Sequence, residues 1–185
     1  MSASLIVSLP PELIQLSSEE NLRKSIDNIN AKLQGKKRVD IYETARVDAT
    51  RPIEETMQIM KRLIQEGKFD HVGLSECSSQ TLRRAHAVHP VASVEIEVSP
   101  WAYEEETKKG WTVSFYPFAF AHRDVVIATA AELQVTVQAY SPLGRGVLTG
   151  QIKKVEDIPE GDYRRTFDRF KPEVCRRSGN FLALG

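Results

Sequence analysis

The regular alternation of short apolar runs with amphipathic helical segments constrains this fold most. Apolar runs that predict strands lie at residues 39–42, 71–74, 92–98 and 135–139, with a shorter run at 5–9. Segments with apolar residues at helical spacing fall between them, and the last of these is an alanine-rich stretch at 125–133. Strand and helix thus alternate about five times. This order predicts an α/β fold built on a parallel sheet.

The predicted helices carry recognisable end signals. Ser17 and Glu20 suggest a capping box at the start of the first helix, and Gly35 lies just past its last apolar position. We expect Pro52 to open the second helix. Ser79 is expected to cap the third, because serine is a favoured N-cap residue. The segments between strands are therefore helices with defined ends.

Composition excludes several classes of function. The 185 residues, 41% of them hydrophobic, suffice for one domain with a core, and no segment has the ~20 apolar residues of a membrane span. Lys plus Arg and Asp plus Glu are 25 each, so no net charge attracts nucleic acid or anionic membrane. The two cysteines lack a ligand spacing, so we assign no metal. These features predict a cytoplasmic or nuclear protein.

Polar side chains follow the predicted strands at the points where the strands end. Because ligands gather at the C-terminal ends of parallel strands, we expect Arg46, Ser75, Glu76, Glu95 and Tyr140 to converge on one face. Glu95 and Glu97 share the polar face of one strand. Two carboxylates within a sheet need partners. This face is the predicted site.

The stretch VTVQAYSPLGRGVLTG at residues 135–150 combines a strand with a glycine-rich loop. We interpret its first part as a buried strand, which Pro142 ends. Gly144 and Gly146 would let the backbone approach a bound group closely, and backbone amides in such a loop can hold phosphate. A glycine-rich turn is a weak signal, so an ordinary strand-to-loop connection is about equally compatible with the residue types.

Three motifs in this order, GKFDHVGLSE, VEIEVSPW and VQAYSPLGRGVLTG, resemble the aldo-keto reductases. The resemblance runs from Ser18 to about Pro172. The segments ETARVD and GLSECSSQTLRRAHAVHPVASVEIEVSPW are most similar to the fungal pyridoxal reductases. The resemblance implies a partial (β/α)8 TIM barrel that binds NADPH across the C-terminal ends of its strands. It also implies reduction of a small-molecule aldehyde such as pyridoxal to the alcohol.

The resemblance also implies roles for individual residues. Ser75 and Glu76 stand where the family holds the nicotinamide carboxamide, and Glu95 stands in place of a glutamine that binds that amide. Tyr140 matches the tyrosine that stacks on the nicotinamide ring. Arg46 occupies the place of the catalytic histidine, where a guanidinium can polarise a carbonyl. The residues expected in the loop along the pyrophosphate are Ser141, Leu143 and Arg145.

The chain also departs from the family pattern. The Asp, the general-acid Tyr and the Lys of the family would lie before or at the start of this chain, and none is found in it. Residues 110–124 form an atypical insertion, which we interpret as translated noncoding sequence rather than a substrate lid or a segment packed on the barrel rim. Residues 174–185 form an atypical tail. We therefore expect a single incomplete domain.

These departures keep a second class of function open. The alternatives are a noncatalytic nucleotide-binding or subunit-interaction module and a nonfunctional fragment. A longer chain that supplies the tyrosine and lysine would favour an enzyme.

Overall fold

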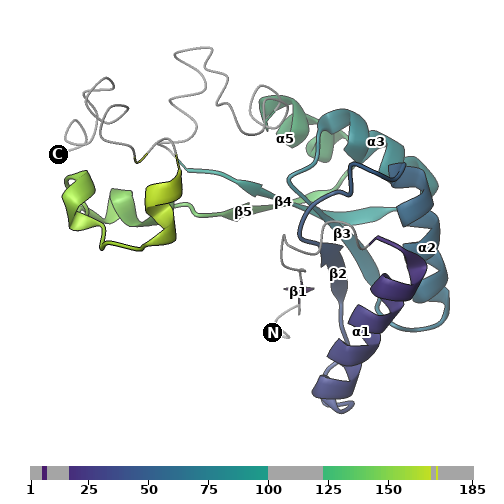
Figure 1. Cartoon of the computed structure of the whole chain (residues 1–185). Helices are drawn as coiled ribbons and strands as arrows, with labels where there is room; N and C mark the ends of the chain where they lie inside the picture. The colour runs from purple at the N-terminus through teal and green to yellow at the C-terminus, as the bar shows by residue number, and fades with distance from the viewer. Residues whose placement is uncertain (1–5, 8–16, 100–122, 168–169, 171–185) are drawn as a thin grey trace. The chain divides into compact units, whose positions relative to one another are not determined.

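The structure is a computed structural model that describes residues 6–7, 17–99, 123–167 and 170 (Figure 1). The chain alternates strands and helices as predicted. Its elements are β1 (Ile6–Val7), α1 (Glu19–Leu33), β2 (Ile41–Thr44), α2 (Ile53–Gln65), β3 (His71–Ser75), α3 (Ser79–Val88), β4 (Val91–Glu97), α5 (Arg123–Glu132) and β5 (Thr136–Tyr140), followed by short 3₁₀ turns η2 (Gly144–Thr149), η3 (Val155–Asp157) and η4 (Tyr163–Thr166).

The strands form one sheet in the order β1-β2-β3-β4-β5. β1 pairs with β2, β2 with β3 and β3 with β4, all in parallel, which confirms the predicted parallel sheet. Glu43 of β2 lies opposite Gly73 of β3, and Gly73 lies opposite Ser93 of β4. Ser75 lies opposite Glu95. This register places the polar residues of three strands on one face.

The chain divides into two compact units. Unit 1 comprises Met1–Ile96 and His122–Gln138, and unit 2 comprises Glu97–Ala121 and Ala139–Gly185. We describe each unit by itself. Unit 1 contains α1, α2, α3 and α5 and most of the sheet.

The core of unit 1 lies between the sheet and its helices (Figure 1). Leu22 and Ile26 of α1 and Met57 and Met60 of α2 are at most 1% exposed, so the methionines serve the core. Burial of each such side chain contributes about 1.5–3 kcal/mol. On the helix side of the sheet, the ring of Tyr42 also packs on that of Phe69, with centroids 5.1 Å apart. The sheet is thereby fixed against the helices.

Two predicted helix caps are each wrong by one residue. Ser18, not Ser17, caps α1, because its side chain accepts from the backbone N–H of Asn21. Ser78, not Ser79, caps α3, because its Oγ accepts from the N–H of Thr81 at 3.1 Å. In both cases two adjacent serines could act as the N-cap. The serine whose backbone is extended is the one that caps the helix.

The prediction that β5 is a buried strand is also wrong. Its side chains are exposed or half-buried, although Val135 just before it is buried. β5 stands last in the strand order, so within the described residues no further strand covers its outer edge. The side chains of β5 are therefore less buried than its apolar sequence predicts.

Several predictions fall on other parts of the chain. The insertion at 110–124 lies outside the described residues except for Arg123 and Asp124, which begin α5, and the tail at 174–185 lies outside them entirely. Ile6–Val7 is the described part of the run at 5–9 and forms β1. Among the described residues no helix has the length and apolar character needed to cross a membrane.

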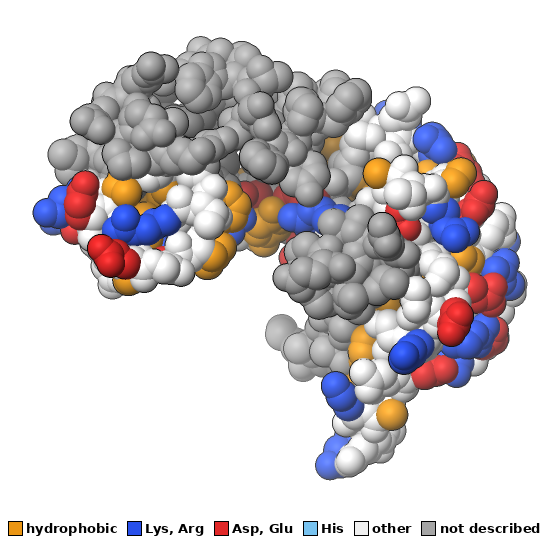
Figure 2. Space-filling view, in the orientation of Figure 1, with side chains coloured by type: hydrophobic (Ala, Val, Ile, Leu, Met, Phe, Trp, Pro, Cys, Tyr) orange, Lys and Arg blue, Asp and Glu red, His pale blue; other side chains and the backbone are white. Residues whose placement is uncertain are grey.

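Charges of both signs alternate over the helices of unit 1 (Figure 2). Arg23 of α1 pairs with Glu19 of its own helix and with Glu66 after α2, and Arg62 of α2 pairs with Glu19 at 2.6 Å. These side chains are substantially exposed, so solvent screens the pairs and each contributes little to stability. The helical surface is thus a neutral, solvated face, as the balanced composition predicts.

The cap of α3 gives a first prediction. Ser78→Ala should lower the free energy of unfolding by about 1 kcal/mol, because it removes the acceptor for a backbone N–H of the first turn. Ser79→Ala is the matched control and should change it by less than about 0.5 kcal/mol. Urea unfolding of the two variants measures this, and equal losses would show that Ser78 is not the cap.

Candidate functional site

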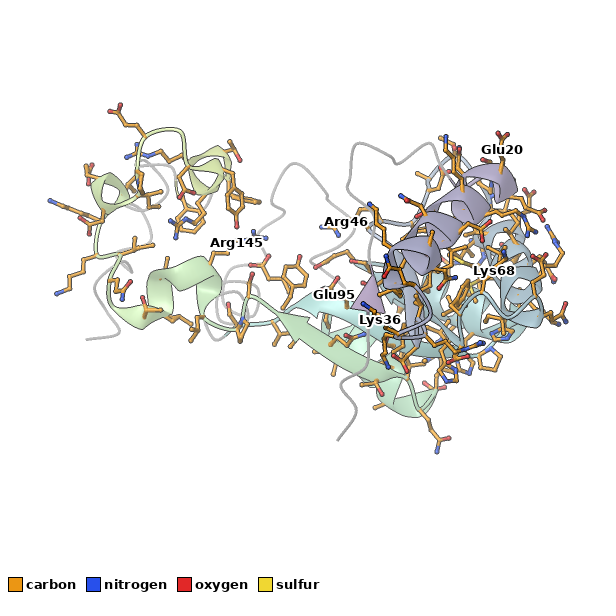
Figure 3. All side chains as sticks on the ribbon, turned by 90° about the horizontal axis from the view of Figure 1, so that it is seen from below. Glu20, Lys36, Arg46, Lys68, Glu95 and Arg145 are labelled. Atoms are coloured by element: carbon orange, nitrogen blue, oxygen red, sulfur yellow. The ribbon has the colours of Figure 1, made fainter. Side chains whose placement is uncertain are left out.

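Ser75, the last residue of β3, links two of the predicted site residues in unit 1. Its hydroxyl accepts a hydrogen bond from Nη1 of Arg46 at 3.2 Å and donates one to Oε2 of Glu95 at 3.2 Å. Figure 3 shows Arg46 and Glu95 near each other, with Glu20 on the helical layer away from them. Three of the five residues expected to converge therefore do so at the C-terminal ends of β2, β3 and β4.

A fourth side chain, which the sequence analysis did not select, completes this cluster. Glu43 of β2 is only 1% exposed, and neither carboxyl oxygen has a hydrogen-bond partner. The hydroxyl of Ser93, also buried, likewise has none. Buried polar atoms without a partner are uncommon, and each costs free energy of folding. This part of the cluster therefore has unused hydrogen-bonding capacity.

Gly73 makes room for the Glu43 carboxyl. A Cβ atom built on Gly73 would lie 2.7 Å from Oε2 of Glu43 and 3.0 Å from Oγ of Ser93. A larger residue would force the Glu43 carboxyl to move and would crowd Ser93 Oγ and Cγ2 of Ile41. Because Gly73 has no side chain, Glu43 reaches across β3 toward the polar residues of β4.

The environment of Glu43 favours its neutral form. Burial is the first cause, followed by the negative charge and close approach of the Glu95 carboxyl, and together they raise the pKa of Glu43 to about 8. The charge of Arg46 opposes this rise. Two ionised carboxylates have no donor to share, whereas one proton lets either carboxyl donate to the other. At neutral pH Glu43 is therefore a carboxylic acid.

The segment after β2, which carries Arg46, is held by a buried carboxylate. Oδ2 of Asp48 accepts from the hydroxyl of Ser17 at 2.5 Å, and its Oδ1 accepts from the N–H and hydroxyl of Thr50. Burial acts to raise the pKa of Asp48, but these hydrogen bonds outweigh it and the pKa is lowered. Ser17 thus anchors this segment rather than capping α1.

Backbone strain gathers at predicted site residues. The non-glycine residues with positive φ among the described residues are Gln34, Glu76, Gln134, Ser141 and Arg145. Gln34 and Gln134 lie just beyond the ends of α1 and α5, where the left-handed conformation is common. Glu76, Ser141 and Arg145 were each selected from the sequence as cofactor-binding. Strain of this kind clusters at ligand sites.

In unit 2, Arg145 is held by a carboxylate and two aromatic rings. Its Nη2 lies 3.3 Å from Oε2 of Glu97, which is 2% exposed. Its guanidinium carbon lies 4.4 Å from the centre of the Phe167 ring and 5.9 Å from that of Tyr163. Glu97 thus finds the partner that a carboxylate inside a sheet requires.

The remaining predicted residues lie in the same unit. Leu143 is 54% exposed, and the N–H groups of Gly144 and Gly146 donate to the carbonyls of Ser141 and Leu143. The carbonyl of Tyr140 accepts from the N–H of Val98 at 3.2 Å. The loop after β5 is therefore a tight turn closed by its own backbone hydrogen bonds.

The described residues offer no group of three or more His, Cys, Asp or Glu side chains that could hold a metal ion. Burial raises the pKa of the Cys77 thiol to about 12, so it stays neutral at ordinary pH. The cluster in unit 1 instead combines a neutral acid, a hydroxyl, a carboxyl and a guanidinium. It can accept hydrogen bonds from N–H groups, donate a proton and stabilise negative charge.

Comparison with known proteins identifies the family. A model of the Aldo/keto reductase family matches residues 8–176. The chain belongs to the aldo-keto reductase family. It is 44% identical over 135 residues to the aldo-keto reductase str7 of Strobilurus tenacellus, which covers 73% of this chain and 36% of that protein. It is 36% identical over 166 residues to the aldo-keto reductase yakc [NADP(+)] of Schizosaccharomyces pombe, which covers 88% and 44%.

Solved structures agree on the fold. A glycerol dehydrogenase from Gluconobacter oxydans superimposes with a TM-score of 0.69 at 22% identity, covering 90% of this chain and 45% of that one. An aldo/keto reductase from Klebsiella pneumoniae in complex with NADP and acetate gives 0.53 at 19% identity, covering 77% and 44%. The fold is part of the TIM barrel of aldo-keto reductases. The chain spans less than half the length of these curated relatives.

The raised pKa of Glu43 gives a second prediction for this aldo-keto reductase. Between the ordinary value of 4.5 and about 8, the folded chain binds the Glu43 proton and the unfolded chain does not, so stability falls as pH rises. Glu43→Gln removes this dependence. The free energy of unfolding of this variant, relative to that of wild type, should rise by about 1–4 kcal/mol as the pH is raised from 5 to 9.

Urea unfolding of both proteins at several pH values measures the effect. Glu20→Gln is the matched control, because Glu20 is exposed on α1. An offset between Glu43→Gln and wild type that stays constant with pH would contradict the assignment of a neutral Glu43.

The Arg145–Glu97 pair gives a third prediction. Arg145→Met leaves Glu97 buried without its cation and should lower the free energy of unfolding by about 3 kcal/mol. Adding Glu97→Gln should recover part of the loss. Lys153→Met, at an exposed position, is the control. A loss for Arg145→Met below about 1 kcal/mol would place the pair among solvent-screened ion pairs instead.

Proposed function

We propose that this chain forms the cofactor-binding part of an NADPH-dependent reductase that converts an aldehyde, such as pyridoxal, to the alcohol. The observation that carries the proposal is the linkage of Arg46, Ser75 and Glu95 at the C-terminal ends of parallel strands. Family membership supports NAD(P)H-dependent reduction of aldehydes or ketones. NADP appears in the name of one relative and in the complex of one structural neighbour.

The residues of the cluster suit the nicotinamide carboxamide. The Glu43 carboxyl and Ser93 Oγ, which have no hydrogen-bond partner, lie on the same face of the sheet as Ser75 and Glu95, and a carboxamide brings two N–H donors and a carbonyl acceptor. Ser75, Glu76 and Glu95 would hold this group, and Tyr140 would stack on the ring. Ser141, Leu143 and Arg145 would lie along the pyrophosphate. When bound, the cofactor supplies hydride to the carbonyl carbon.

Arg46 would act on the carbonyl. Its guanidinium keeps its charge at all working pH values, so it stabilises negative charge on the oxygen but does not shuttle a proton. Ser75 and the carbonyl of Ala45 fix its orientation, through hydrogen bonds at 3.2 and 2.6 Å. Preorganised donors of this kind reduce the barrier because they need not reorient during the reaction.

A paired substitution tests the proposal. Pyridoxal reduction, followed by NADPH absorbance, should fall about 10²-fold in Arg46→Met, because the developing charge loses its donor. Arg38→Met is the matched control, since Arg38 is exposed and pairs with Asp70 on the surface. Its rate should equal that of wild type.

Fluorescence titration with NADPH separates the two classes of function. NADPH binding without turnover would favour the noncatalytic nucleotide-binding module. The absence of both would contradict the proposal altogether.

A further inference from the structure

Glu43 and Glu95 come from strands that are not neighbours, yet they lie on the same face of the sheet, and the charge of Glu95 acts on Glu43. β3 lies between β2 and β4, and Gly73 is the β3 residue opposite Glu43. The missing side chain opens the way across the strand, since a Cβ there would lie 2.7 Å from Oε2 of Glu43. The sheet is thus built to let one carboxyl approach the other.

The two carboxyls differ in their access to solvent and in their partners. Glu43 is 1% exposed, and its oxygens lack partners. Glu95 is half-buried and accepts from the hydroxyl of Ser75. Glu43 therefore forms the inner half of the pair, and Glu95 forms the outer half next to the predicted position of the nicotinamide.

Among the described residues, the charges that act on Glu43 balance only when the pair holds a proton. Arg46 is the cation that acts on Glu43, and it reaches Glu95 through Ser75. Ser93 and Gly73 contribute no charge. With one proton on the pair, one carboxylate faces one guanidinium. With none, an uncompensated negative charge is left in a buried place, which is costly.

We propose that Glu43 and Glu95 hold one proton between them and release it when a positive charge forms beside Glu95, as it does on the ring of an oxidised nicotinamide cofactor. A nearby cation favours the ionised form of a carboxyl and lowers its pKa by about 1–3 units. The pair would therefore hold its proton beside the neutral reduced ring and would be doubly ionised beside the cationic oxidised ring.

This assignment rests on the proposed function, because the cation that discharges the pair is the ring of the oxidised cofactor. The proton would leave to solvent when the oxidised cofactor binds, and the pair would take one back from solvent when the reduced cofactor replaces it. Glu43 is a positioning residue, since it shares the proton with Glu95, which lies next to the predicted position of the ring.

Proton counting during cofactor binding tests the proposal without turnover. Isothermal titration calorimetry of the full chain at pH 7, in buffers of different ionisation enthalpy, gives the number of protons exchanged when NADP+ or NADPH binds. The two share every phosphate, so the difference between them isolates the charge of the ring. Wild type should release about 0.5–1 more proton with NADP+ than with NADPH.

Variants assign the proton to the pair. Glu43→Gln should abolish the difference, and Glu20→Gln, at an exposed site on α1, should retain it (Figure 3). Equal proton counts for the two cofactors in wild type would overturn the inference while leaving the proposed function standing. Binding of neither cofactor would overturn both. The wild-type measurement decides the matter even if Glu43→Gln does not fold.

Discussion

The burial of the Glu43 carboxyl inside a parallel sheet is the constraint on which the polar face of this aldo-keto reductase depends. A carboxyl that is 1% exposed and lacks a hydrogen-bond partner is stable only when neutral or beside a compensating charge. The sheet meets this condition with Gly73, which leaves the space, and with Arg46, which supplies the charge. Ser75 then ties Arg46 to Glu95. The polar contacts on this face of β2, β3 and β4 therefore centre on one buried carboxyl.

Unit 2 also contains a buried carboxyl, but there a cation balances its charge. Glu97, two residues after Glu95 on β4, is also buried, but it is neutralised by Arg145 at 3.3 Å rather than by a proton. The rings of Phe167 and Tyr163 lie beside the guanidinium, with their centres 4.4 and 5.9 Å from its carbon. Because Arg145 already faces Glu97, a phosphate would meet a partly neutralised guanidinium there.

The sequence predicted the layout of the fold well, because strand and helix periodicity are local signals. The parallel sheet, its element order and the cluster of Arg46, Ser75 and Glu95 follow from strand ends and are confirmed. Glu43 was missed because its significance depends on register: only opposite Gly73 does it reach toward β4. The caps at Ser17 and Ser79 failed for a local reason, since adjacent serines are equivalent in sequence but not in backbone conformation. The catalytic role of Arg46 stays a prediction. The cofactor roles also stay predictions, for Ser75, Glu76, Glu95, Tyr140, Ser141, Leu143 and Arg145.

A pH titration of the cofactor-free chain, followed by the infrared band of protonated carboxyl groups, tests most directly whether Glu43 is a neutral acid. We expect one carboxylic acid to remain protonated at pH 7, to titrate with a midpoint near 8 and to be absent from Glu43→Gln. Complete ionisation of every carboxyl by about pH 6, where ordinary Asp and Glu side chains have lost their protons, would contradict it.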